Sequence, residues 1–319
     1  MDLIDDIERP QSKPRLVFRR PVLAALLSIF FPGLGQVYNG EPKKGAILLG
    51  LIYVVILLTC PTGLILHFYG LVIIVFLELC IRIYIIYDAY RTSKRLSSYV
   101  KKTYNTWYYH VLIGLGILVL NFTFVLSGML RVRSFSIDTG AGEPVVQVQD
   151  KVLADMWAYN SADPTYGDIV IFEHEEMYWT YRVVGMQGDK LDIIDNKVYL
   201  NDKSCEVENS EEPVAMKRGD YERRFGIHKK QFTFFERLPN GHTYEVFRDS
   251  LFEDNPYAIS TVLDIKIPKD HYYLLGNNRS NALDSRFIGL IHKDRVQGRV
   301  IYSYWGATSD RINVDFRTL

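Results

Sequence analysis

Three long apolar runs within the first 130 residues constrain the fold of this chain more than any other feature. They extend over Gly45–Cys60, Leu64–Tyr87 and Trp107–Leu130, and Pro61-Thr62-Gly63 separates the first two. A helix of about 20 apolar residues crosses a hydrocarbon core of about 30 Å. Three such runs in one third of a chain are typical of a membrane domain, the alternative being the buried helices of a soluble core. We expect no cleaved signal peptide, because more apolar runs follow the first.

The basic residues between these runs predict their orientation. Residues 91–102 include five basic residues and no acidic one, and Lys43 and Lys44 precede the first run. Cytoplasmic loops of membrane proteins carry an excess of Lys and Arg. Both segments are therefore expected in the cytoplasm, so that the third run delivers the residues after Arg131 to the outer side. The chain is predicted to be a multi-pass protein of the plasma (inner) membrane.

A fourth apolar segment, Pro21–Tyr38, is interrupted by Pro32-Gly33-Leu34-Gly35. If it crossed the membrane, the two lysines before the first long run would lie outside, against the charge rule. We interpret it as a re-entrant or interfacial segment. Within the second run, Glu78 and Arg82 lie four residues apart on one helical face and are expected to pair. The predicted organisation is a cytoplasmic tail over 1–20, a membrane domain over 21–130 and an outer domain over 131–319.

The residues after Arg133 have a different composition, in which short apolar runs alternate with Gly, Pro, Asn and Asp. This pattern predicts one mostly β domain, with strands at Tyr166–Phe172 and Lys197–Leu200 and a turn at Asn201-Asp202. The chain has 37 basic and 37 acidic residues. Because the charges balance and no basic stripe interleaves with aromatic residues, we expect no nucleic-acid partner. The Cys and His residues show no metal-ligand spacing, and we expect neither a metal nor an organic cofactor.

Residues 276–289 read G-N-N-R-S-N-A-L-D-S-R-F-I-G and resemble the last signature box of type I signal peptidases, G-D-N-R-x-x-S-x-D-S-R-x-x-G. Three further segments match other boxes of that family in order and spacing. Arg133–Ile137 is similar to the S-G-S-M box, Tyr166–Phe172 to G-D-I-V-V-F, and Tyr181–Asp189 to K-R-V-I-G-L-P-G-D. The resemblance covers about residues 131–305. It implies an antiparallel β fold for the outer domain and a serine endopeptidase that removes signal peptides from secretory precursors.

The resemblance also implies the roles of individual residues. It makes Ser136 the nucleophile and Ser134 a neighbouring hydroxyl that stabilises the oxyanion. Asp284 and Arg286 are expected to form an ion pair that braces the site. The remaining site-supporting positions are Arg182, Asn278, Arg279 and Ala282. Implied partners are the signal peptides of precursors, which bind as an extended strand at the edge of the outer sheet, and membrane lipid.

Two linked parts of the family's catalytic device are replaced in this chain. Tyr181 occupies the position of the general-base lysine, and Ala282 that of the serine that orients it. A free phenol near pKa 10 is only about a thousandth ionised at pH 7, so the identity of the base stays open between Tyr181 and Lys151. The Met-x-Pro that usually follows the nucleophile is also replaced, by Ile137-Asp138-Thr139 and a Gly-rich insertion, Gly140-Ala141-Gly142.

Three functions are compatible with these departures. The first is an active signal peptidase I-like serine endopeptidase with an unusual base. The second is an inactive or weakened paralogue, a pseudoenzyme that binds precursors or a partner protein. The third is a structural membrane module with an outer β domain that does not bind signal sequences.

The predicted orientation is tested by reporter fusions. A topology reporter after Thr62 should be active on the outer side of the membrane, and one after Ser97 on the cytoplasmic side. The residues after Arg131 should resist protease that is added from the cytoplasmic side. Reversal of both reporters would contradict the orientation.

Overall fold

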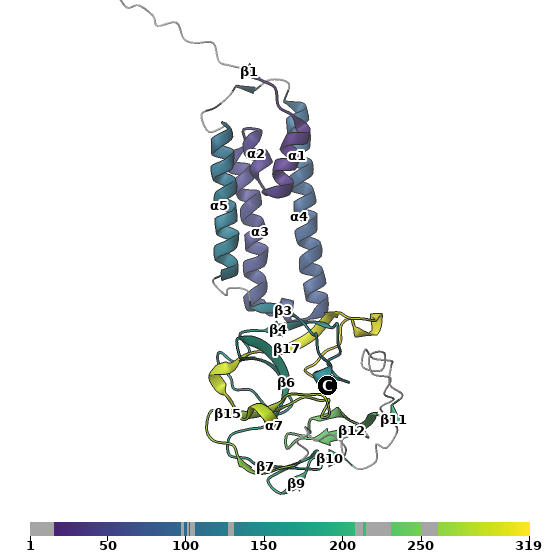
Figure 1. The fold of residues 1–319 in the computed structure, drawn as a ribbon. Coiled ribbons are helices and arrows are strands. Elements are labelled where there is room, and N and C mark those ends of the chain that lie inside the picture. Colours follow the sequence, from purple (N-terminus) through teal and green to yellow (C-terminus); the bar gives the residue numbers. More distant parts are fainter. Residues whose placement is uncertain are drawn as a thin grey trace, which may run out of the picture. The chain divides into compact units, whose positions relative to one another are not determined.

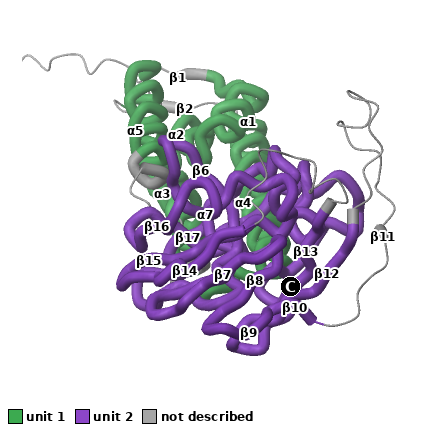
Figure 2. Tube along the Cα trace, turned by 60° about the horizontal axis from the view of Figure 1, so that its bottom comes forward, with its two compact units in different colours: residues 1–130 green, residues 131–319 purple. Residues whose placement is uncertain are grey.

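The computed structural model describes residues 16–96, 99–100, 102, 106–126, 131–207, 213–214, 231–249 and 261–319. The chain divides into two compact units, residues 1–130 and residues 131–319, which Figure 2 distinguishes by colour. Each unit is described by itself.

The first unit is helical (Figure 1). Its helices are α1 (Pro21–Phe30), α2 (Leu34–Tyr38), α3 (Pro42–Thr62), the 3-10 turn η1 (Leu64–Leu66), α4 (Phe68–Arg95) and α5 (Trp107–Leu126), and the short strands β1 (Leu16–Val17) and β2 (Tyr99–Val100) pair with each other. α3 ends at Gly63, which adopts a left-handed conformation. The chain thus breaks where Pro61-Thr62-Gly63 predicted a break between the first two apolar runs.

The interrupted segment forms two separate helices rather than one. Gly33, at the start of α2, has φ of 89°, and a Cβ atom at this position would lie 2.4 Å from the carbonyl oxygen of Gly45. Only glycine fits such a close approach in this conformation. The buried amides of Gln36 and Asn39 then donate to the carbonyl oxygens of Ile85 (2.8 Å) and Ala89 (2.7 Å). α2 is therefore attached to α4 through polar contacts inside the helical unit.

Among the described helices, α4 alone is both long and apolar enough to cross a membrane by length and composition. α1 and the apolar part of α5 are shorter. The expected pair of Glu78 and Arg82 is confirmed, because the Arg82 Nη2 atom lies 2.8 Å from Glu78 Oε1. The number of spans and their orientation stay predictions.

The second unit is mostly β, as predicted. Its main sheet has the antiparallel strand order β16-β15-β6-β5-β17-β4-β3. The strands of this sheet are β3 (Val132–Ser136), β4 (Lys151–Asp155), β5 (Ile169–His174), β6 (Met177–Gly185), β15 (His271–Leu275), β16 (Ile291–His292) and β17 (Val296–Trp305). Short helical segments are η2 (Gly140–Gly142), α7 (Ser285–Ile288), η4 (Lys293–Arg295) and η5 (Ser309–Arg311).

Two four-stranded sheets lie in the described part of this unit as well. One has the order β14-β7-β8-β9, and in the other β10 and β11 pair with β12, which also pairs with β13. Their strands are β7 (Lys190–Ile194), β8 (Lys197–Leu200), β9 (Lys203–Ser204), β10 (Glu206–Val207), β11 (Pro213–Val214), β12 (Gln231–Arg237), β13 (Thr243–Asp249) and β14 (Val262–Lys266).

The strand predictions for this unit are largely correct. Lys197–Leu200 is β8 as predicted, and the turn after it has positive φ values at Asn201 (52°) and Asp202 (64°). The other predicted strand begins later, at Ile169, because Tyr166–Asp168 forms a turn in which Gly167 has φ of 90°.

A buried ion pair connects the β12–β13 sheet to the loop that follows β15. The Arg279 guanidinium donates to both carboxylate oxygens of Glu236, with Nη1 2.8 Å from Oε1. Both side chains are almost fully buried, at 2% and 0% exposure. Tyr244 also donates to Glu236, at 2.6 Å. The removal of one partner of such a pair leaves an uncompensated charge in the interior.

Arg279→Met should therefore lower the free energy of unfolding by about 3 kcal/mol. The matched control is Lys190→Met, which breaks the exposed Lys190–Asp202 pair (3.0 Å) and should leave stability nearly unchanged. The denaturation midpoints of the full chain in detergent check both variants. A shift for Arg279→Met as small as that of the control would contradict this assignment.

Candidate active site

The position of Ser136 follows from the pairing of β3 with β4. In this antiparallel pair Ser136 lies opposite Lys151 and Ser134 opposite Leu153. The ladder continues one residue further, since the Ile137 amide donates to the Asp150 carbonyl (2.9 Å) and its carbonyl accepts from the Gln149 amide (2.8 Å). Successive residues of an extended chain point to opposite faces, and every second residue shares a face. Ile137 is buried in the core, so Ser136 and Asp138 share the other, exposed face.

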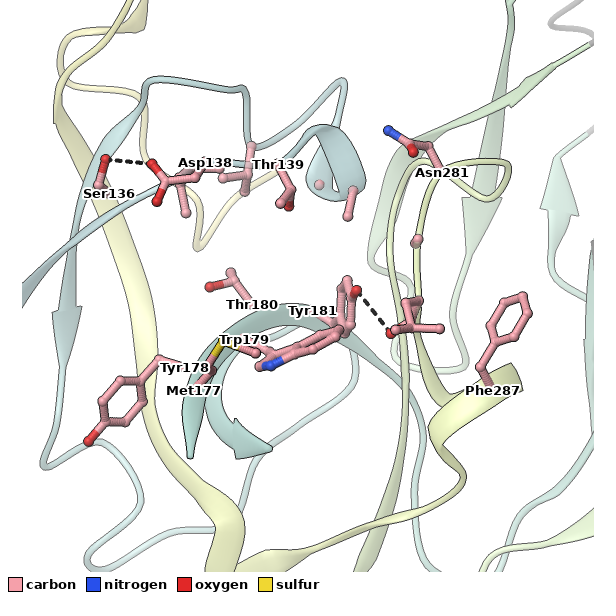
Figure 3. A pocket seen from close by; sticks show the side chains of 16 residues that line it. Ser136, Asp138, Thr139, Met177, Tyr178, Trp179, Thr180, Tyr181, Asn281 and Phe287 are labelled. Atoms are coloured by element: carbon pink, nitrogen blue, oxygen red, sulfur yellow. Dashed lines mark hydrogen bonds between the residues drawn. The ribbon is translucent and has the colours of Figure 1, made fainter. Parts of the chain in front are cut away.

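Ser136 donates a hydrogen bond to the carboxylate two residues further along the chain. Its Oγ atom lies 3.2 Å from Asp138 Oδ1, as the dashed line in Figure 3 shows. Ser134, the predicted oxyanion hydroxyl, lies on the same strand, and its Oγ is 2.6 Å from the hydroxyl oxygen of Tyr304 on β17. The two serines that the resemblance identified are therefore on one strand, each with a different oxygen partner.

A cavity of about 620 Å³ lies beside Ser136. Its walls come from the end of β3 and η2, from β6, and from the segment before and within α7 (Figure 3). Most of the lining side chains are apolar or aromatic. The lining residues are Ser136, Ile137, Asp138, Thr139, Ala141, Gly142, Val146, Met177, Tyr178, Trp179, Thr180, Tyr181, Asn281, Ala282, Leu283 and Phe287.

Tyr181 reaches this cavity from β6, but its hydroxyl is not directed at Ser136. It donates to the carbonyl oxygen of Leu283 at 3.1 Å, as the dashed line at Tyr181 in Figure 3 marks. The side chain is only 5% exposed. Burial, together with the negative charge of Asp284, raises the pKa of the Tyr181 phenol above its ordinary value. A neutral phenol that is already a donor to a carbonyl is poorly suited to accept the serine proton.

Ala282 and Tyr181 both border Gly276, the first residue of the last signature box. A Cβ atom at Gly276 would lie 2.4 Å from the Ala282 Cβ, 2.7 Å from the Ala141 carbonyl oxygen and 3.3 Å from the Tyr181 Cε1. The Phe172 ring also packs against Tyr181, with ring centroids 5.8 Å apart and an angle of 39° between the ring planes. The two replaced positions thus belong to one cluster of buried apolar and aromatic side chains.

The expected brace of Asp284 and Arg286 is present. Arg286 Nε lies 2.8 Å from Asp284 Oδ1 and its Nη2 lies 2.9 Å from Oδ2. Asp284 also accepts from the Gly276 amide at 3.0 Å, and Arg286 donates to Asn196 at 3.0 Å. This buried pair holds α7 and the chain before it against the end of β15.

The other predicted supporting residues lie around the cavity rather than in it. Arg182, 1% exposed, is on the face of β6 opposite to Tyr181 and donates to the carbonyl oxygens of Gly167 (2.7 Å) and Leu319 (2.8 Å). The backbone amide of Asn278 donates to the Ala141 carbonyl oxygen at 3.0 Å, which attaches the loop to η2. Arg279 attaches the same loop to Glu236, as described above.

Lys151, the other candidate base, lies directly opposite Ser136 on β4. Opposed residues of an antiparallel pair share a face of the sheet, so its side chain is on the face of Ser136. The side chain is exposed. A lysine becomes neutral near pH 7 when burial removes it from water, and this position lacks such burial.

Two residues of the site were not identified from the sequence. The motif comparison gives no role to Asp138. Its i, i+2 spacing from Ser136 in an extended segment nevertheless predicts that the two side chains lie on one face, close enough for contact. Glu236 carries no comparable signal, because its contact with Arg279 joins residues 43 apart in the chain. Among the described residues, no group of three or more His, Cys, Asp or Glu side chains is placed to hold a metal ion.

Parts of the chain are similar to known proteins. A sequence model of the family described as "Signal peptidase, peptidase S26" matches residues 105–305. Signal peptidase I of Rickettsia typhi is 28% identical over 218 residues, which cover 58% of this chain and 78% of that protein. Signal peptidase I of Rickettsia canadensis is 28% identical over 198 residues, covering 52% and 70%. A crystal structure of a signal peptidase I from Enterococcus faecalis V583 matches with 23% identity and a TM-score of 0.24, over 43% of this chain and 96% of that chain.

Proposed function

We propose that this chain, which belongs to the signal peptidase family, peptidase S26, is a membrane-anchored serine endopeptidase of the signal peptidase I type. Its substrates are secretory precursors, from which it removes the signal peptide. Ser136 is the nucleophile. The observation that carries this proposal is the cavity of about 620 Å³, which is lined by the exposed residue Ser136.

The edge of the main sheet provides a binding site for an extended peptide. Among the described strands, β3 is the last in the order of this sheet, and only β4 pairs with it. An unpaired edge offers backbone N–H and C=O groups to an added strand. A precursor bound along this edge brings its scissile carbonyl to Ser136, while the apolar cavity accepts the small residues of an A-x-A-like cleavage site.

The reaction is acyl transfer in two stages. The Ser136 oxygen attacks the scissile carbonyl, the signal peptide remains as an ester on the serine, and water then hydrolyses that ester. Negative charge develops on the carbonyl oxygen in both stages and needs nearby hydrogen-bond donors. The hydroxyl of Ser134 serves as one donor, held by its contact with Tyr304.

The helical unit anchors the enzyme in the membrane that holds its substrate. We propose that α3, α4 and α5 cross the plasma membrane and place residues 131–319 on the outer side, as the basic segments around them indicate. The apolar region of a signal peptide lies in the same bilayer. Confinement of enzyme and precursor to one membrane raises their effective concentration without any new contact.

Substitution of the two serines tests the proposed roles. Ser136→Ala should abolish release of a reporter that carries an A-x-A site, because no other group forms the acyl intermediate. Ser134→Ala should slow release by about 10²–10³-fold, since it removes one oxyanion donor. Release is measured with the full chain in detergent or liposomes.

Equal release by the wild type and by Ser136→Ala would discard Ser136 as the nucleophile. If the wild type itself releases nothing but binds the precursor, the chain is a paralogue that binds without cleaving. Absence of both cleavage and binding would leave only a structural role.

Restoration of the family's base provides a second test. Tyr181 and Ala282 border the same glycine, so Tyr181→Lys with Ala282→Ser should place an amine and its orienting hydroxyl together in the apolar cluster. The double variant should cleave the reporter faster than the wild type. Tyr181→Lys alone should gain less, because an unheld amine stays flexible and charged.

The comparison of the single and double variants is the readout. The gain of the double variant should exceed the product of the two single effects, as expected for groups that act as one unit. Ala282→Ser alone is the matched control and should change the rate little. A folded double variant with no gain over the wild type would show that the cavity does not accommodate the family's base.

A further inference from the structure

Three buried side chains from three different segments form one wall of the cavity, which we call its floor. Ala141 comes from η2, Tyr181 from β6 and Ala282 from the loop before α7. All three line the cavity and belong to one core cluster, with exposures of 7%, 5% and 9%. The one polar side-chain group among them, the Tyr181 hydroxyl, already donates to the Leu283 carbonyl oxygen. The floor therefore offers a peptide two methyl groups and an aromatic ring.

The three segments meet at Gly276. A Cβ atom at this glycine would lie 2.4 Å from the Ala282 Cβ, 2.7 Å from the Ala141 carbonyl oxygen and 3.3 Å from the Tyr181 Cε1. The same Ala141 carbonyl oxygen accepts a hydrogen bond from the backbone amide of Asn278 at 3.0 Å. These contacts hold the floor in place from both η2 and the loop after β15.

The sequence around Ala141 shows which positions of the family the floor occupies. The family's S-G-S-M box and the proline of its Met-x-Pro read together as S-G-S-M-x-P, and residues 139–144 of this chain read T-G-A-G-E-P. Gly140 and Pro144 match the glycine and the proline of that pattern. Ala141 then stands at its second serine, beside Tyr181 at the lysine and Ala282 at the orienting serine. The floor thus occupies all three positions of the family's catalytic device.

The replacement of these three groups changes what the floor does to a bound peptide. An amine or a hydroxyl loses water when a peptide covers it, which costs free energy unless the group finds a new partner. Methyl groups and a ring face carry no such cost, and their contact with an apolar side chain is favourable. No group of the floor is placed to attack a carbonyl carbon. Such a surface binds a small apolar side chain and leaves the peptide bond beside it intact.

We propose that the floor is a holding site, which binds a small apolar residue of an extended, signal-peptide-like segment and does not react with it. This inference rests on the proposed binding of a precursor along β3 and adds the residues that retain it. It is separate from the role of Ser136, which is exposed and is not a member of the buried cluster. Retention depends on Ala141, Tyr181 and Ala282, whereas any cleavage depends on Ser136.

The first test locates the peptide on the unaltered full chain in detergent. The probe is a synthetic signal peptide with an A-x-A site, in which an aliphatic diazirine residue replaces the last alanine. A ketomethylene group replaces the amide bond after it, so that the probe stays intact. After illumination, mass spectrometry should find the crosslink on peptides that contain Ala141, Tyr181 or Ala282. Crosslinks confined to other parts of the chain would overturn the holding site.

The second test fills the floor. Ala141→Leu should weaken binding of the same peptide about tenfold or more, because the larger side chain takes the space of the bound residue. The matched control is Ala162→Leu, an exposed alanine that does not line the cavity, and its affinity should equal that of the wild type. Fluorescence anisotropy measures both dissociation constants, and the denaturation midpoint shows whether Ala141→Leu is folded. Wild-type affinity in Ala141→Leu would contradict the proposal.

A triple variant tests whether the floor stands at the family's catalytic positions. Ala141→Ser with Tyr181→Lys and Ala282→Ser should make residue 141 reactive, because a hydroxyl, an amine and an orienting group are then adjacent. The probe is a fluorophosphonate: the serine oxygen bonds to phosphorus, fluoride leaves, and the amine takes the serine proton. The control places the new serine at residue 162 instead and should take no label there. A triple variant that binds the peptide but takes no label at residue 141 would overturn this assignment.

Cleavage is followed separately, with a peptide that keeps its ordinary amide bond. Binding at the floor with no release by the wild type would support the holding site and refute the proposed cleavage. Release by the wild type, together with undiminished binding by Ala141→Leu, would refute the holding site and leave the peptidase function intact.

Discussion

The pairing of β3 with β4 is the constraint on which the proposed site depends. It fixes which residues of a short edge strand point inward and which point outward. The side chain of Ile137 points inward and packs in the core. Ser134, Ser136 and Asp138 then follow at alternate positions on the outer face. A shift of this register by one residue would bury the proposed nucleophile and expose the core. Among the described strands only β4 pairs with β3, and the other edge of β3 is where we propose that a peptide binds.

The second constraint is the way in which the loop of residues 276–284 is held. Asp284 and Arg286 form a buried pair, Arg279 binds Glu236, and the Asn278 amide binds the Ala141 carbonyl. These contacts place Ala282 and Leu283 against Tyr181. The family's lysine and orienting serine are thus replaced by an apolar cluster, with the tyrosine hydroxyl satisfied by a carbonyl oxygen.

Much of this arrangement was predictable from the sequence because it depends on local patterns and on motifs of fixed spacing. The break after α3, the strand Lys197–Leu200, the pair of Asp284 and Arg286 and the mostly β outer unit were expected and are present. The direction of the Tyr181 hydroxyl was not predictable, since it depends on the path of a loop about 100 residues away. Glu236 was missed for the same reason: a buried partner from a separate sheet leaves no periodic signal. The contact of Asp138 with Ser136 was predictable from the sequence, because residues i and i+2 of an extended strand share a face.

The most direct test of the account is to trap the covalent intermediate. The full chain is incubated with a precursor peptide that carries an A-x-A site, the reaction is quenched in acid, and the chain is digested and mapped by mass spectrometry. The account predicts that the peptide containing Ser136 gains the mass of the signal-peptide fragment as an ester. Cleavage of the precursor with no acyl group on Ser136, or with the acyl group on another residue, would contradict it.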